Sequence, residues 1–259
     1  MCKEEKAKEL PETRTRVGAV IPVFGQFDFA YRTVTSLIDS VPDATIVMVD
    51  DCSTDELGWT YLVQSLRHHN VATHRFHRNK GITRGWNFGA EFLLARGCSH
   101  VLFANSDLVF PRQFLPPLLR VLAAGRKLVG PLTNAPGHVP EQNVRRYLTG
   151  YQLSDAPDLI NTTQCELARF GNTSVDHKVN GFCFLTTANT LIANRYNSKC
   201  FFNPAPRFRM IRNEDEFQGR LFKMYGAEAA AIVLSSFVFH YRGVTRGING
   251  SSEGWFRPA

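Results

Sequence analysis

Short apolar segments alternate with helix-length segments over the first half of the chain, and this alternation limits the possible folds more than any other feature. Val17 to Val23 is a β-branched, apolar run typical of a buried parallel strand. Residues 27–38 follow it with apolar side chains at helical spacing. Because parallel strands need crossover connections, this pattern predicts a mostly parallel central sheet flanked by helices. The predicted fold class is α/β.

The alternation continues to residue 131 and then loosens. Further strands are predicted at 45–49, 71–76 and 101–104, and helices at 53–67, 83–94 and 114–124. An edge or switch strand is predicted at 128–131, and loops with a short helix at 132–176, which is rich in Pro, Gly, Asn, Thr and Gln. The pattern then predicts a strand at 179–187, helices at 188–194 and 214–225, and an apolar strand at 229–241. No boundary is sharp enough to indicate two independently folding domains.

The positive charge of the chain is unevenly placed. The formal net charge is +7, and no acidic residue lies between Glu56 and Glu91, where several arginines and a lysine fall. Such a basic balance favours an anionic ligand, either nucleic acid or a phosphorylated small molecule. The basic residues are not interleaved with aromatic residues in a recognisable nucleic-acid-binding module, so we expect no nucleic-acid partner.

The sequence also bears on where the protein is found. No apolar run approaches the roughly 20 residues needed to cross a bilayer, so no integral membrane segment is expected. Residues 1–16 are charged throughout and do not resemble a signal peptide; we expect a flexible lead-in. The six cysteines form no Cys-x-x-Cys pair, which favours reduced thiols. A cytoplasmic location is therefore expected.

Polar residues follow several predicted strands at the point where each strand ends. The 101–104 strand leads into Asn105, Ser106 and Asp107. Ligands of open α/β sheets bind at the carboxyl ends of the strands, and a carboxylate there is suited to a divalent cation. An ordinary Asn-Ser-Asp turn is the alternative. The other strand-end groups are Pro22 and Phe24, Asp50 and Asp51, and the glycine-punctuated loop with Lys80, Gly81 and Arg84.

The loop before the predicted helix 83–94 indicates a phosphate site. Free backbone amides at a helix start, together with Lys80 and Arg84, favour phosphate, although a solvated basic face would give the same pattern. Asp55 is expected to cap its own helix, which is the common fate of aspartate there.

This set of motifs, in this order, resembles the inverting glycosyltransferases of family 2, which have the GT-A fold. The resemblance continues through Val179-Asn180-Gly181, through Glu214-Asp215 with Arg220, and through His240-Tyr241-Arg242-Gly243, and so covers nearly the whole chain. The rhamnosyltransferase-like branch is most similar, since it also tends to have Asn at the position of Asn105. The family often has Arg where this chain has Trp86.

The resemblance implies a nucleotide-sugar site. Asp51 would bind the base ring, Pro22 and Phe24 would supply backbone and stacking contacts, and Asn105 and Ser106 would lie at the donor. Asp107 and His240 would hold Mn²⁺ or Mg²⁺. For Asp51 the alternative is turn formation, and for His240 a buried, hydrogen-bonded histidine. The first position of the triplet is Asn105 and not Asp, so the metal site has one negative charge less. An enzyme that does not depend on a metal is therefore an alternative.

The resemblance further implies a catalytic base. Inversion at the anomeric carbon needs one group to take the proton from the acceptor hydroxyl. Asp215 matches the aspartate of the family motif that ends at Arg220. Alternatively, the acids at 214–216 serve only to favour the start of their helix.

The expected function is thus transfer of a sugar, with inversion, from a nucleoside diphosphate to a hydroxyl of a glycan, glycoprotein or other acceptor. UDP is the default donor base, and dTDP- or UDP-rhamnose fits the rhamnosyl likeness. We expect a single domain at 17–243, with a nucleotide-sugar half at 17–131, an acceptor half at 132–243 and a tail at 244–259. A nucleotidyltransferase is one alternative, but its Gly-rich signature near the first strand is missing. A non-catalytic nucleotide- or sugar-binding module is the other.

Overall fold

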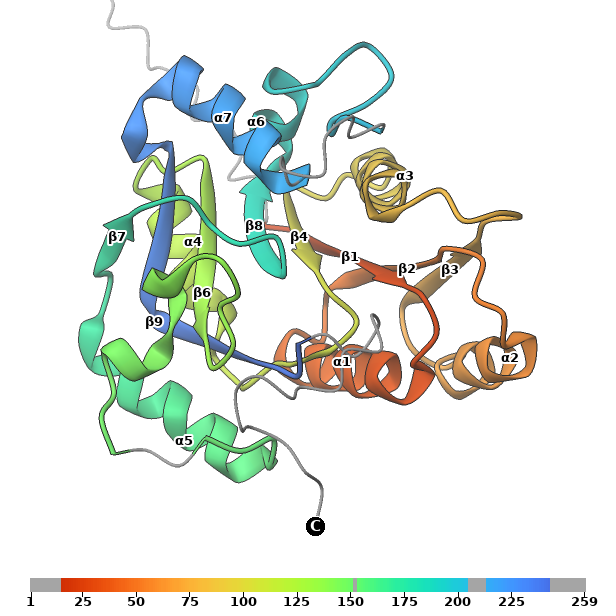
Figure 1. Ribbon diagram of the computed structural model, residues 1–259, viewed down its shortest axis with the longest axis horizontal. Coiled ribbons are helices and arrows are strands. Elements are labelled where there is room, and N and C mark those ends of the chain that lie inside the picture. The colour runs from red at the N-terminus through yellow and green to blue at the C-terminus, as the bar shows by residue number, and fades with distance from the viewer. Residues whose placement is uncertain (1–14, 151–152, 205–212, 243–259) are drawn as a thin grey trace, which may run out of the picture.

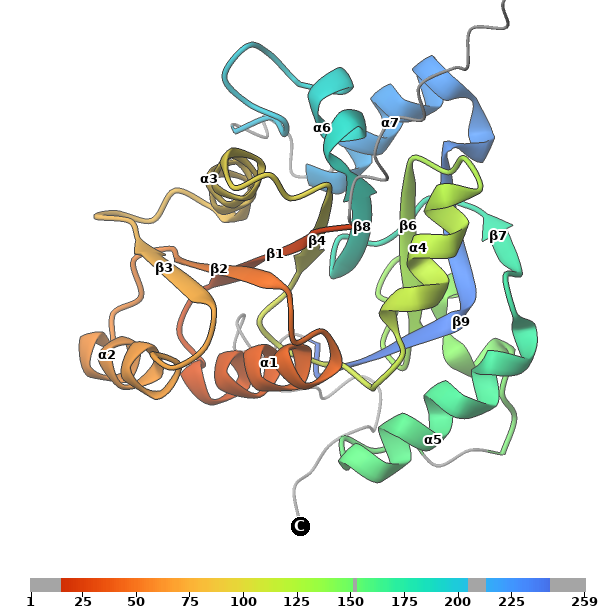
Figure 2. The same cartoon turned by 180° about the vertical axis from the view of Figure 1, so that it is seen from behind.

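The computed structural model describes residues 15–150, 153–204 and 213–242, and these form one mixed sheet with helices on both faces (Figures 1 and 2). The predicted lead-in, apart from its last two residues, and the predicted tail lie outside the described residues, as does Gly243. In the described part of the chain no helix is long and apolar enough to cross a membrane.

The sheet has nine strands, and its path runs β3-β2-β1-β4-β8-β6-β9-β5, with β7 paired to β9. The strands are β1 (Val17–Val23), β2 (Thr45–Asp50), β3 (Val71–Arg75), β4 (His100–Ala104), β5 (Leu108–Val109), β6 (Leu128–Thr133), β7 (Ser174–Asp176), β8 (Cys183–Thr187) and β9 (Ala230–His240). The helices are α1 (Phe27–Ser40), α2 (Glu56–Ser65), α3 (Ile82–Ala95), α4 (Leu115–Ala123), α5 (Pro157–Leu167), α6 (Ala188–Ala193) and α7 (Asn213–Tyr225).

The direction of pairing differs between the two ends of the sheet. β1 to β4 pair in parallel, as the strand–helix alternation predicts. β8 then runs antiparallel to both β4 and β6, and β6 pairs in parallel with β9. β5 and β7 are antiparallel to β9. The sheet is therefore parallel in its first half and mixed in its second, where β8 enters without a preceding crossover helix.

The helices cover the sheet because each has one apolar face. In α1 the residues Ala30, Val34 and Leu37 recur at helical spacing and are buried. Helices α1, α2 and α4 pack on one face of the sheet, and α3, α6 and α7 pack on the other (Figures 1 and 2). Gly89 lets α3 lie against β1, since a Cβ there would lie only 2.4 Å from a Val20 methyl group.

Some predicted boundaries differ from the structure. The helix predicted to begin at Ser53 begins at Glu56, and Asp55 is its N-cap, accepting a hydrogen bond from the amide of Gly58 (2.9 Å), as expected for Asp55. The segment 128–131 is not an edge strand, because β6 lies between β8 and β9 and is buried throughout. The region 132–176 contains the 11-residue helix α5 in addition to loops.

Helix α5 is hydrogen-bonded to a bulge in β9. Pro131 and Leu132 of β6 are neighbours, yet they pair with Val233 and Phe237 of β9. The side chain of Gln164, on α5, forms hydrogen bonds with backbone groups at this bulge. It donates to Ser235 O (2.8 Å) and accepts from Phe237 N (2.9 Å). α5 is therefore tied to the sheet by a polar contact that hydrophobic periodicity cannot reveal.

Candidate active site

The polar ends of the first four strands lie along one edge of the sheet. Val23 and Asp50, at the ends of β1 and β2, are register partners, and the amide of Asp51 donates to Val23 O (2.9 Å). β4 is the other neighbour of β1, and Asn105 follows it directly. Phe24, Asp51 and Asn105 therefore lie at the same edge, as expected for a ligand site at the carboxyl ends of parallel strands.

Asp107 and His240 lie beside each other although 133 residues separate them in sequence. β5, directly after Asp107, pairs with the end of β9, and Leu108 is the register partner of His240. The distance between Asp107 Oδ1 and His240 Nε2 is 3.4 Å, and both side chains are buried. The structure thus brings together the two residues that the family resemblance gives as metal ligands.

The residues after β6 fix His240. The Asn134 side chain accepts from His240 N (2.8 Å) and donates to His240 O (3.1 Å). His240 Nδ1 lies 3.1 Å from the carbonyl oxygen of Ala135, which can only accept, so Nδ1 carries the proton. Nε2 of a neutral His240 then presents a lone pair to Asp107. The ring of Phe182 stacks on His240 at 5.1 Å between centroids.

This arrangement fits a cation. Asp107 Oδ1 is buried, accepts no hydrogen bond within the described residues and lies 3.4 Å from His240 Nε2. In general, two ligand atoms bound to one ion at right angles, each at about 2.1 Å, lie about 3.0 Å from each other. The distance between Asp107 Oδ1 and His240 Nε2 is close to this value. In the residues the structure describes, no group of three or more His, Cys, Asp or Glu side chains forms a metal site. Asp107 and His240 would therefore hold an ion that takes its other ligands from water or from the bound molecule.

Tyr241 anchors the same end of β9. Its amide donates to Asp107 O (3.0 Å), and its hydroxyl donates to Asp155 (2.7 Å) and accepts from Arg32 (3.1 Å). Burial, reinforced by Asp155, raises the pKa of Tyr241 to about 12. The position of His240 is thus fixed from both sides.

The Asp51 carboxylate binds the loop before α3. Its oxygens accept from the amides of Lys80 (2.6 Å) and Gly81 (2.8 Å). These two amides were expected to be free for phosphate, and that expectation is wrong because Asp51 occupies them. Asp50 is buried, pairs with Arg75 (3.1 Å) and accepts from the amide of Ser53 (3.3 Å), a contact that closes the turn after β2. Each oxygen of Asp51 retains acceptor capacity for a further donor.

We expect Asp51→Asn to destabilise the protein, because an amide nitrogen would then face a backbone N–H group. Hydrogen bonds to a charged acceptor contribute about 1.5–3 kcal/mol, so the free energy of unfolding should fall by roughly that amount. Urea denaturation measures it, with the exposed turn residue Asp43→Asn as control. Equal stability of the two variants would contradict the anchoring role.

The other residues that are predicted to bind the nucleotide-sugar donor lie along the same edge, and they differ in how far they are buried. The ring of Phe24 is 44% exposed, while Ser106 is buried. The Lys80 ammonium lies over the Phe76 ring (4.3 Å), and Arg84 is exposed on the first turn of α3. Pro22 packs within van der Waals reach of α3 at Gly85.

Asp215 lies in the first turn of α7, half-buried. Its Oδ1 atom lies 3.6 Å from Lys178 Nζ and 3.9 Å from His138 Nε2. The neighbouring Glu214 is buried and accepts from the amide of Gly181 (3.1 Å). Asp215 is therefore the more accessible of these two carboxylates.

Arg220, at the end of the same motif, ties helices together. It donates to the carbonyl oxygens of Asn194 (3.0 Å) and Phe201 (2.8 Å) and pairs with Glu216 (3.3 Å). Burial lowers the pKa of Arg220, and Glu216 acts in the opposite direction. Arg220 thus holds α7 against the segment that follows α6.

Sequence reasoning missed several residues of this site, namely Asn134, Ala135, His138 and Lys178. Asn134 directly follows β6, so a polar residue at a strand end was the available signal. For His138 and Lys178 the sequence offers no such signal, since both lie in irregular segments that only the fold brings to Asp215.

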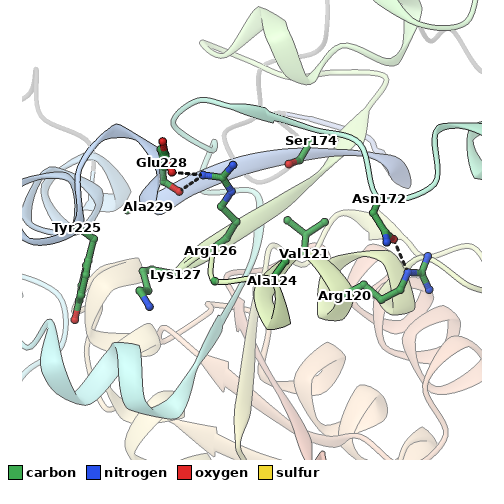
Figure 3. Close-up of a pocket in the computed structure, with 11 residues that line it drawn as sticks. Arg120, Val121, Ala124, Arg126, Lys127, Asn172, Ser174, Tyr225, Glu228 and Ala229 are labelled. Carbon is green, nitrogen blue, oxygen red and sulfur yellow. Dashed lines mark hydrogen bonds and ion pairs between the residues drawn. The ribbon is translucent and has the colours of Figure 1, made fainter.

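A pocket at the other end of β6 is separate from this edge. It is lined by basic side chains, among them Arg120, Arg126 and Lys127 (Figure 3). Lys127 precedes β6, whereas Asn134, which binds His240, follows it. Arg126 pairs with Asp176 (2.8 Å) and donates to the carbonyl oxygen of Glu228 (2.7 Å). Arg126 is therefore already paired, while Arg120 donates to the side-chain oxygen of Asn172 (2.7 Å).

Comparison with solved structures defines the class of fold. The S. aureus TarS 1-349 structure in complex with UDP is 13% identical, with a TM-score of 0.56, and matches 87% of this chain and 60% of that chain. The structure of GalNAc-T7 with UDP, GalNAc and Mn²⁺ is 16% identical, with a TM-score of 0.59, and matches 88% of this chain and 44% of that chain. The fold is therefore that of the GT-A glycosyltransferases, and this chain spans less than two thirds of either neighbour.

The sequence itself identifies the family. Residues 19–186 match the model of glycosyl transferase family 2. The chain belongs to this family. A search of curated proteins finds no match.

Proposed function

We propose that this protein is an inverting glycosyltransferase that moves a sugar from a nucleoside diphosphate, UDP in the first instance, to a hydroxyl group of a glycan or other acceptor. The observation that carries the proposal is the pair of Asp107 Oδ1 and His240 Nε2, 3.4 Å apart at the strand-end edge. The UDP in the TarS structure and the UDP and Mn²⁺ in the GalNAc-T7 structure support it. Family membership supports sugar transfer from an activated donor.

In the proposed donor site each residue has a distinct task. The exposed ring of Phe24 stacks on the base, Pro22 shapes the floor beneath it, and Asp51 accepts from the base while holding the loop at Lys80 and Gly81. Asn105 and Ser106 lie beside the donor. Lys80 and Arg84 supply positive charge for the diphosphate. A Mn²⁺ or Mg²⁺ ion held by Asp107 and His240 would supply Lewis-acid charge to the diphosphate oxygens.

Asp215 acts as the base in this proposal. The bond between the anomeric carbon and the diphosphate oxygen breaks, and the electron pair leaves with the nucleoside diphosphate. The acceptor oxygen forms the new bond from the opposite face, and its proton passes to Asp215. The half-exposed side chain of Asp215 and its place on the first turn of α7 support this role.

The proposal also covers the donor sugar and the roles of the two halves of the chain. A rhamnosyl-type donor, with dTDP or UDP, accords with the presence of Asn105. Residues 17–131 bind the nucleotide sugar and residues 132–243 the acceptor within one domain. His240 belongs to the second half in sequence but reaches the donor edge through β9.

A thermal-shift panel of UDP, GDP, dTDP and CDP, each with and without Mn²⁺, tests the donor site. We expect one diphosphate to raise the melting temperature, Mn²⁺ to enhance the rise, and Asp107→Ala to abolish the enhancement. Ligand at 100 times its dissociation constant stabilises by about 2.7 kcal/mol, so the shift is measurable. Asp43→Ala, in an exposed turn, is the control. A failure of every nucleotide to shift the melting temperature would overturn the proposal in favour of a module that does not bind these donors.

A further inference from the structure

The buried oxygen of Asp215, Oδ1, faces His138, which has no role in the proposed reaction. Oδ1 of Asp215 and Nε2 of His138 are both buried, and neither makes a hydrogen bond within the described residues. The two atoms lie 3.9 Å apart. His138 Nε2 lies at the same distance from Glu214 Oε1. A donor and an acceptor thus lie just beyond hydrogen-bond distance of each other, next to the proposed base.

Asn180 determines which nitrogen of His138 carries the proton. Nδ2 of Asn180 donates to the carbonyl oxygen of Pro136 (2.5 Å) and lies 3.1 Å from His138 Nδ1. A carbonyl oxygen only accepts, so this atom of Asn180 is the amide nitrogen, and its second hydrogen is directed to Nδ1. Nδ1 is therefore the acceptor of the ring, and the proton of neutral His138 is on Nε2. Its N–H group faces the carboxylates of α7.

Of the two carboxylates, Asp215 is the one whose near oxygen is unused. Glu214 Oε1 already accepts from the amide of Gly181 (3.1 Å). Asp215 Oδ1 accepts no hydrogen bond within the described residues, and the exposure of the side chain therefore falls on its other atoms. Lys178 also faces Oδ1, but its side chain is 41% exposed, so solvent screens it.

The turn that carries His138 is shaped around Asn180. Gly137 has a φ of +67°, and a Cβ there would lie 2.7 Å from Asn180 Nδ2. The backbone of Asn180 is fixed in turn, since its amide donates to Gln142 Oε1 (2.7 Å). The orientation of His138 is therefore set by residues 136–142 and by Asn180, whose neighbours Val179 and Gly181 are in turn hydrogen-bonded to Gln218 and Glu214 of α7.

We propose that His138 is a positioning residue for the base: its Nε2–H group donates to Asp215 Oδ1 when the acceptor binds, and this directs Oδ2 toward the acceptor hydroxyl. The inference rests on the proposed function, in which Asp215 takes the acceptor proton. Catalytic hydrogen bonds are often long before substrates bind and shorten in the reacting complex, which accords with the 3.9 Å separation.

The test compares His138→Leu, which removes the donor, with His138→Gln, whose amide nitrogen reaches about the place of Nε2. The assay is release of UDP from a UDP-sugar (UDP-glucose and UDP-N-acetylglucosamine as probes), with water in place of the acceptor. We expect His138→Leu to lower kcat by on the order of 10- to 100-fold with KM for the UDP-sugar unchanged, as for a misplaced base. His138→Gln should recover most of the rate. His69→Leu, on the surface, is the control.

The outcomes separate this inference from the proposed function. A full rate in His138→Leu, when Asp215→Asn is inactive, overturns the positioning role alone. A fall in both histidine variants together with a lower melting temperature and a raised KM also overturns it, because that is the result of a structural role. An active Asp215→Asn overturns the role of Asp215 in the proposed function and this inference together.

Discussion

Replacing Asp215 by asparagine is expected to lower the turnover of a UDP-sugar by about 10²–10⁴-fold, the usual contribution of a general base. The amide of asparagine cannot take the proton of the attacking hydroxyl, while it keeps the size and most contacts of the carboxylate. UDP affinity should not change, because Asp215 belongs to α7, whereas the proposed donor site lies at the strand ends of β1, β2 and β4. UDP release measured with UDP titration by calorimetry checks both statements.

Glu216→Gln is the matched control for that substitution. Glu216 is one residue away on the same helix turn and pairs with Arg220 (3.3 Å) at a side chain that is 31% exposed. Exposed ion pairs contribute only about 0–1 kcal/mol, so this variant should keep a nearly normal rate. If Glu216→Gln were the inactive variant and Asp215→Asn the active one, the base would be misassigned.

Trp86→Ala should give the largest loss of stability among the residues of the loop and helix at 79–89, about 3–5 kcal/mol in the free energy of unfolding. Trp86 is 1% exposed, and its ring contacts Phe103, Phe184 and Phe202. Removing the ring leaves a cavity that these aromatic rings cannot close without moving. Urea denaturation measures the loss, with Tyr61→Ala as control because that ring is 67% exposed.

The same burial makes arginine unfavourable at position 86. Trp86→Arg would place a guanidinium among the rings of Phe103, Phe184 and Phe202, so it should destabilise at least as much as alanine does. A stable, well-folded Trp86→Arg variant would contradict this packing. Lys80 and Arg84 are therefore the cations of this loop that remain for a phosphate in the proposed donor site.

The strands of the first half could be predicted because one local signal determines them. Val17 to Val23 and Thr45 to Asp50 are apolar runs bounded by polar residues, and the structure has β1 at the predicted bounds and β2 one residue longer. α5 was underestimated because its periodicity is weak and Thr163 and Gln164 are buried polar residues. Gln164 is buried because it bonds the bulge in β9, a contact that depends on the tertiary fold.

Some residues of the candidate site could likewise be predicted from the sequence, and others could not. Asp107, Asp215 and His240 could be chosen because they match family motifs, and the closeness of Asp107 to His240 follows from the pairing of β5 with β9. The occupation of the Lys80 and Gly81 amides by Asp51 could not be predicted, because a loop conformation decides it. Asn134 and His138 were not chosen since their roles depend on where an irregular segment passes after β6.

The bulge in β9 makes the spacing of this strand part of the site. Leu234, Ser235 and Ser236 lie between the residues that pair with Pro131 and Leu132, and His240 follows on the same strand. Side chains of a strand alternate between its two faces, so loss of one residue here would turn the histidine away from Asp107. Substitutions at Ser235 and Ser236 would remove the hydrogen bonds of their hydroxyl groups to Gly171 O and Phe114 O, whereas a change of length would shift the register of the whole strand end. The orientation of His240, the proposed cation ligand, thus depends on the number of residues in the bulge.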